Sequence, residues 1–132
     1  MLDKKEILVT KAKMMVLQSK DSLPLDIGEG VMLNRIGFNE SNLTIRSEYT
    51  YPVADEIVPE EKGDLIEILL GTVCIGLSND AQMMEYLENG FTVNYVYFDT
   101  KGNLFTELNI DQQIFYEVLK IITDVMSEEE QE

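Results

Sequence analysis

The chain has 132 residues, of which 45% are hydrophobic and 27% charged, and this composition predicts one folded domain instead of a disordered chain. Its formal net charge of -15 excludes the proteins that bind nucleic acid or anionic membranes through clustered Lys and Arg. The chain has no histidine and a single cysteine, Cys74, which excludes an intrachain disulfide, a histidine metal ligand and a Ser-His-Asp triad.

Residues 3–20 predict an amphipathic helix, because they contain no Pro or Gly and their apolar side chains recur at helical spacing. We expect the helix to end before Pro24, since the residue that precedes a proline avoids helical conformation. The first 20 residues hold five lysines against Asp3 and Glu6, a charge of +3, which leaves -18 for residues 21–132. A weakly basic helix therefore precedes a strongly acidic body.

Apolar and polar residues alternate in two pairs of segments along the chain. The first pair spans residues 31–38 and 43–51, and the second spans residues 91–98 and 104–110. A short segment rich in turn-forming residues separates the two members of each pair. Each pair therefore predicts an antiparallel hairpin with one buried side and one solvent-facing side.

The region between the two hairpins predicts a surface crossover followed by two helices. Residues 52–63 contain two prolines and several acidic side chains, which suits an exposed connection. Asp64 is expected to cap a helix over residues 65–77, which is apolar nearly all round and is therefore predicted to be deeply buried. Asn79 with Gln82 resembles the capping box of a second, shorter helix.

The last element is an amphipathic helix that opens at Asp111. The predicted fold class is α+β, with a four-stranded antiparallel sheet of two hairpins, helices packed on one face and the order αββααββα. We expect a single domain over residues 1–126 and a flexible acidic tail over residues 127–132.

The sequence offers no convincing catalytic, cofactor-binding or metal-ligating residues. Cys74 lies in the most apolar segment without a basic neighbour, where a thiol behaves as a small hydrophobic side chain. With 25 acidic residues, carboxylate pairs arise by chance throughout the chain and do not indicate a glycosidase or a magnesium site. We therefore expect no enzymatic activity, no cofactor and no metal.

Two surfaces are candidates for binding a partner. Aromatic residues recur at alternating positions of the predicted strands and either line a protein-binding face or pack beneath the helices with their hydroxyls at the rim. The second candidate is the acidic crossover near Glu60 and Glu61. The aromatic residues are Tyr49, Tyr51, Tyr95, Tyr97 and Phe98.

These features favour a non-catalytic protein-interaction domain of unknown partner. The alternative is an acidic inhibitor or immunity-type protein that blocks a basic, nucleic-acid-binding site, because residues 21–132 carry a charge of -18. A third hypothesis, a small-molecule binder or an enzyme that uses the strand aromatics, requires a closed pocket with convergent polar groups. Homodimerisation through the first helix or a free strand edge is also open.

Several segments between roughly residues 5 and 110 share a pattern of hydrophobic spacing, with a cysteine within a helix and a Tyr-x-Tyr hairpin. These segments are Leu23-Pro24-Leu25-Asp26 through Val31-Met32-Leu33, Leu43 to Tyr51, Val73-Cys74, Leu87-Glu88-Asn89-Gly90-Phe91-Thr92-Val93-Asn94-Tyr95-Val96-Tyr97-Phe98-Asp99 and Gly102. Together they resemble a family of small bacterial envelope proteins that includes uncharacterised lipoproteins and type II secretion pilotins.

The resemblance implies an N-terminal helix packed on a four-stranded antiparallel sheet, no enzymatic activity and a role in holding another protein. The sequence departs from the family because it has no lipid-modified N-terminal cysteine and no second cysteine after the last strand to pair with Cys74. As written, the chain shows no export signal or membrane span, which predicts a cytoplasmic location. A cell-envelope location is expected instead if an N-terminal signal has been removed.

Overall fold

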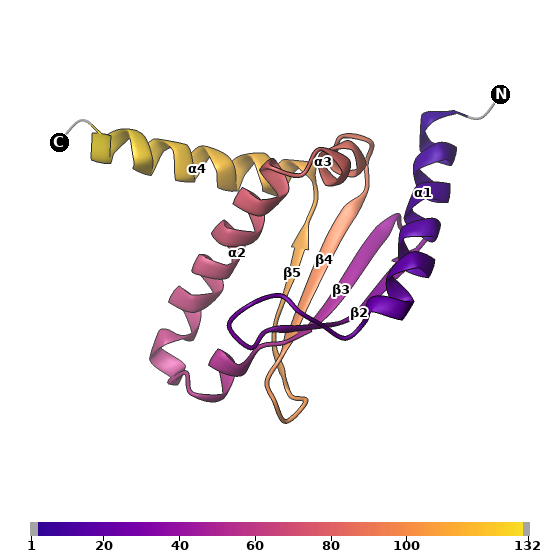
Figure 1. Cartoon of the computed structure of the whole chain (residues 1–132). Coiled ribbons are helices and arrows are strands. Elements are labelled where there is room, and N and C mark those ends of the chain that lie inside the picture. The colour runs from indigo at the N-terminus through magenta and orange to yellow at the C-terminus, as the bar shows by residue number, and fades with distance from the viewer. Residues whose placement is uncertain (1–2, 131–132) are drawn as a thin grey trace.

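The helices and strands follow the chain in an order that the sequence largely predicted (Figure 1). The structure is a computed structural model that describes residues 3–130. Its α-helices are α1 (Lys4–Ser19), α2 (Lys62–Ser78), α3 (Ala81–Glu88) and α4 (Gln112–Glu130). Its strands are β1 (Leu25–Asp26), β2 (Met32–Asn39), β3 (Thr44–Thr50), β4 (Thr92–Phe98) and β5 (Leu104–Ile110). Short 3-10 helices occupy Lys20–Ser22, Pro52–Asp55 and Pro59–Glu61.

The sheet formed by residues 3–130 has five strands in the order β1-β2-β3-β4-β5, instead of the predicted four. Strands β2 and β3, and strands β4 and β5, form the two predicted antiparallel hairpins. Strands β3 and β4 run parallel, however, with Ser47 beside Tyr95 and Tyr49 beside Tyr97. The prediction of a wholly antiparallel sheet is therefore wrong, because α2 and α3 return the chain to the end at which β3 begins. The α+β class is confirmed.

The helices pack on one face of the sheet and divide the core into two clusters, as Figure 1 shows by the separate positions of α1 and α2. The smaller cluster lies beneath α1 and joins this helix to β2, β3 and α3. The larger cluster joins α2 and α4 to β4 and β5. The buried members are Leu8, Ala12, Ile45, Tyr86 and Phe91 in the smaller cluster, and Cys74, Leu77, Leu87, Val93, Tyr97, Phe105, Leu108, Ile110 and Phe115 in the larger.

The opposite face of the sheet carries a network of polar side chains. Asn94, only 3% exposed, donates hydrogen bonds from Nδ2 to Glu107 Oε1 (2.9 Å) and Asn109 Oδ1 (2.6 Å). Arg46 lies beside Asn94 on the neighbouring strand and donates from Nε to Glu48 Oε2 (3.2 Å). Because buried polar groups need such partners, this network explains how a polar residue is accommodated in the interior strand β4.

Three helix N-terminal caps were predicted, and two of these predictions are wrong. Asp64 does not cap α2, which begins before it and has no side-chain cap. The cap of α3 is Asp80 instead of the predicted Asn79, because the Asp80 carboxylate accepts a hydrogen bond from the amide of Met83 (3.1 Å). Asp111 accepts a hydrogen bond from the first turn of α4, and the predicted start of this helix is confirmed.

Helix α4 includes residues 127–130, which the sequence assigned to a flexible tail. Residues 131–132 of that predicted tail lie outside the described residues, and the domain boundary at residue 126 stays a prediction. Figure 1 shows the C-terminal half of α4 projecting beyond the sheet. Within the described part of the chain, no helix is both long enough and apolar enough to cross a membrane.

The hydroxyl of Tyr86 is buried in the smaller cluster and has no hydrogen-bond partner within residues 3–130. An unpaired buried hydroxyl is unfavourable, so we expect Tyr86→Phe to leave the free energy of unfolding unchanged or to raise it by up to about 1 kcal/mol. Tyr86→Ala, in contrast, should lower it by about 3–5 kcal/mol because the ring is fully buried. Urea denaturation of both variants tests this, and a clear loss of stability in Tyr86→Phe would show that the hydroxyl is paired.

Candidate partner-binding groove

Helix α2 presents an apolar surface that the other described residues leave uncovered. Its fully buried residues are Cys74 and Leu77, whereas Ile68 is 64% exposed and Ile75 47% exposed. The prediction of a deeply buried helix is therefore wrong, because the sheet and α4 cover one side of α2 only. Exposed apolar surface on a soluble domain often marks a contact site for another molecule.

A groove of about 660 Å³ lies beside this surface, and we call it the tyrosine groove. One wall is α2, with Ile68, Thr72 and Val73. The other wall is the loop between β1 and β2, which contributes Ile27 and Val31. The remaining lining residues are Gly28, Glu29, Tyr49, Tyr51, Leu69, Gly76, Leu77, Asp80, Met83, Tyr95 and Tyr97.

The groove's four tyrosines form a continuous row of packed rings. Tyr49 lies between Tyr95 and Tyr97, with ring centroids 6.2 Å and 5.0 Å away and nearly parallel planes. Tyr51 continues the row with its centroid 5.7 Å from that of Tyr97. The parallel register of β3 and β4 creates this row, because it places Tyr49 directly beside Tyr97.

The environment of these rings holds their hydroxyls in the neutral form. Burial raises the pKa of Tyr49, Tyr95 and Tyr97 above the ordinary value for a tyrosine. Burial also raises the pKa of Tyr51, with a further contribution from the negative charge of Glu29. The row therefore offers aromatic surface with uncharged hydroxyls at neutral pH, which suits contact with apolar or cationic groups.

The loop that forms the second wall has an unusual backbone conformation. Gly28, Glu29 and Gly30 all have positive φ values, of 115°, 56° and 79°. Glycine adopts such values freely, but a residue with a side chain is disfavoured there. The loop is supported by a hydrogen bond from the amide of Gly28 to the carboxylate of Asp26 (2.8 Å), and it holds Glu29 at the rim of the groove.

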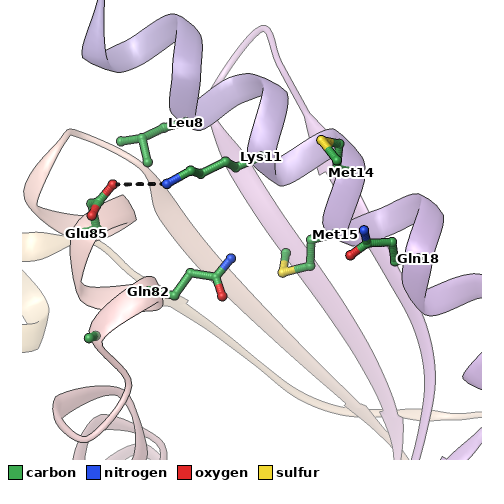
Figure 2. A pocket seen from close by; sticks show the side chains of 8 residues that line it. Leu8, Lys11, Met14, Met15, Gln18, Gln82 and Glu85 are labelled. Atoms are coloured by element: carbon green, nitrogen blue, oxygen red, sulfur yellow. Dashed lines mark ion pairs between the residues drawn. The ribbon is translucent and has the colours of Figure 1, made fainter.

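A second hollow of about 440 Å³ lies between α1 and α3, and we call it the methionine cleft (Figure 2). Met14 and Met15 line it from α1, and Gln82 lines it from α3. Lys11 Nζ lies 3.9 Å from Glu85 Oε1 across the cleft, as Figure 2 shows. The start of α3 contributes to both hollows, since Asp80 and Met83 line the tyrosine groove while Ala81 and Gln82 line the cleft.

Only some of the residues predicted to bind a partner lie together in the structure. The four predicted tyrosines all line the tyrosine groove, whereas Phe98 does not. Glu60 and Glu61 are exposed in the short helix before α2 and lie outside the groove. That any of these residues binds a partner stays a prediction. The sequence did not identify Ile68 and Glu29 as groove residues. The apolar character of α2 on all sides could have indicated that one face of this helix is left uncovered.

Cys74 belongs to the larger core cluster and is fully buried, as its apolar surroundings in the sequence predicted. Burial raises the pKa of its thiol to about 11. At neutral pH the thiol is therefore protonated and a poor nucleophile.

Comparisons with known proteins give a clear result for the fold. No model of a known protein family matches the sequence, and no curated protein sequence matches it. Among solved structures, the pilotin EpsS of the Vibrio vulnificus type 2 secretion system is 18% identical with a TM-score of 0.65, and the match covers 85% of this chain and 94% of that one. The type II secretion pilotin AspS from Vibrio cholerae is also 18% identical, with a TM-score of 0.61 and coverage of 84% and 94%.

The chain has the fold of type II secretion pilotins. A Pseudomonas aeruginosa protein described as secreted shares this pilotin fold, with 14% identity, a TM-score of 0.63 and coverage of 87% of this chain and 99% of that one. The resemblance inferred from the sequence is thereby confirmed. The matches span nearly the whole length of all three similar proteins.

Proposed function

We propose that this protein is a non-catalytic, pilotin-like domain that holds an apolar segment of another protein in the tyrosine groove. The observation that carries the proposal is the combination of an open groove, floored by tyrosines, with a wall helix whose Ile68 is 64% exposed. Aromatic and aliphatic surface of this kind is typical of the centres of protein interfaces.

The pilotin fold supports a role in a bacterial secretion apparatus, because two of the similar structures are components of type II secretion systems. These similar proteins also favour a cell-envelope location over the cytoplasmic one expected from the sequence as written. The alternative function, inhibition of a basic nucleic-acid-binding site, draws no support from them. We therefore propose that the protein acts in the cell envelope by holding a partner.

Site-specific photo-crosslinking tests this proposal in the bacterium that produces the protein. A benzophenone amino acid at Thr72, which is exposed in the groove wall, should crosslink to one main protein that mass spectrometry identifies as a secretion component. The matched control is the same amino acid at Asn109, which is exposed on the opposite face of the sheet. Equal crosslinking from both positions, or none from Thr72, would count against the proposal.

A further inference from the structure

The ionisable side chains of the tyrosine groove, apart from its tyrosines, are all acidic. Glu29 and Asp80 line the groove, and no lysine or arginine is among its lining residues. Three of the four lysines of α1 lie near acidic side chains outside the groove, since Lys4 and Lys11 lie near Glu85 and Lys13 pairs with Glu40. The groove is therefore an apolar surface that carries two carboxylates, and its lining residues include no cation to balance their charge.

The two carboxylates reach the groove from different elements, Glu29 from the loop between β1 and β2 and Asp80 from the start of α3. The charge of Glu29 contributes to the raised pKa of Tyr51, and the charge of Asp80 contributes to that of Tyr95. Tyr51 and Tyr95 are the outer members of the four-tyrosine row. One carboxylate therefore lies near each end of the row, with apolar surface between them.

An aromatic ring next to the row already contacts a cation within the molecule. Phe105 extends the row beyond Tyr51, with a centroid separation of 6.1 Å, and Lys62 Nζ lies 5.4 Å from the Phe105 centroid. Lysine and arginine are attracted to aromatic ring faces, and a nearby carboxylate strengthens this preference. The groove ends thus combine the two features that favour a cationic side chain.

We propose that the occupant of the tyrosine groove is an apolar protein segment that carries a lysine or arginine toward each of its ends. This inference rests on the proposed function and adds the chemistry of the partner. An apolar segment without cations would remove water from Glu29 and Asp80 and leave both carboxylates without a counter-charge, which disfavours binding. A segment with acidic ends would meet direct repulsion.

A random peptide library displayed on phage tests the proposal with the folded, full-length chain. Peptides are selected on the native protein, and those that fail to bind Ile68→Glu are taken as groove-dependent. We expect these peptides to be apolar in the middle and enriched in Lys or Arg near both ends relative to the starting library. Their affinity should fall as salt concentration rises.

Charge-neutralising variants provide the control. Asp80→Asn keeps a side-chain oxygen that can cap α3, and Glu29→Gln keeps the size of the side chain. The double variant should bind the selected peptides about 10-fold more weakly, whereas Glu88→Gln, an exposed change on α3 outside the groove lining, should not alter binding.

The outcomes separate this inference from the proposed function. Groove-dependent peptides that lack basic residues, or that bind the double variant as tightly as the native protein, would overturn the inference and leave the proposed function standing. Failure to obtain any groove-dependent peptide would count against the proposed function itself.

Discussion

Replacing Ile68 with glutamate is expected to weaken binding of the groove's partner by about 100-fold or more while the domain stays folded. The isoleucine is 64% exposed in the free protein, so little of its surface is lost from the core on substitution. In the complex its side chain is expected to be buried, and losing that burial costs about 1.5–3 kcal/mol. Placing an uncompensated carboxylate in the same contact adds a desolvation penalty. Together these terms exceed the roughly 2.7 kcal/mol that corresponds to a 100-fold change in Kd.

The matched control is Ile121→Glu, because Ile121 is 63% exposed on helix α4 and lies outside the tyrosine groove. Both substitutions add the same charge to an equally exposed isoleucine in a helix. Isothermal titration calorimetry with the crosslinked partner or a selected peptide measures the difference, and thermal unfolding confirms that both variants are folded. Equal loss of binding in the two variants would show that acidity, and not the groove, is responsible.

Alkaline pH is expected to destabilise the domain strongly. The pKa values of Tyr49, Tyr95 and Tyr97 are raised in the folded protein from the ordinary value of 10.0. Above pH 10 the unfolded chain releases these protons while the folded protein retains them, so the free energy of unfolding falls as pH rises. A tyrosine that stays protonated at pH 11 in the folded protein contributes a loss of about 1.4 kcal/mol at that pH, so Tyr95 and Tyr97 together contribute up to about 3 kcal/mol, and Tyr49 adds a loss of the same sign.

Urea denaturation at a series of pH values from 8 to 11 measures this loss. Tyr97→Phe removes one of the ionisable groups and keeps the ring, so the variant should lose about 1 kcal/mol less than the native protein between the two ends of the series. Absorbance at 295 nm should show delayed tyrosine ionisation in the folded state. A native protein that keeps its full stability at pH 11 would show that the tyrosine hydroxyls are accessible to solvent in the fold.

Much of the fold followed from local patterns in the sequence. The alternation around Tyr49 and Tyr95 predicted both hairpins, and the apolar spacing after Asp111 predicted α4. The parallel pairing of β3 with β4 was missed, because alternation defines the faces of a strand but not its neighbours or their direction. The two-residue strand β1 was missed because so short a segment has no periodicity to detect.

The candidate groove was predictable only in part. The tyrosines were identified from their alternating positions, but their assembly into one row depends on the parallel register that the sequence did not reveal. Ile68 was taken as a core residue, because an apolar pattern predicts burial without distinguishing the protein's own core from a contact with another molecule. The placement of Glu29 depends on a loop with successive left-handed residues, which only the three-dimensional structure shows.

The division of the core into two clusters has a mechanical consequence for the groove. Met83 is the half-buried residue that packs against both clusters, while α1 is anchored in the smaller cluster and α2 in the larger. Displacing α1 would therefore disturb the packing around Ile45 and Phe91 and leave the interior beneath α2 and α4 intact. The tyrosine row packs within the larger cluster, so its arrangement is expected to persist when α1 moves.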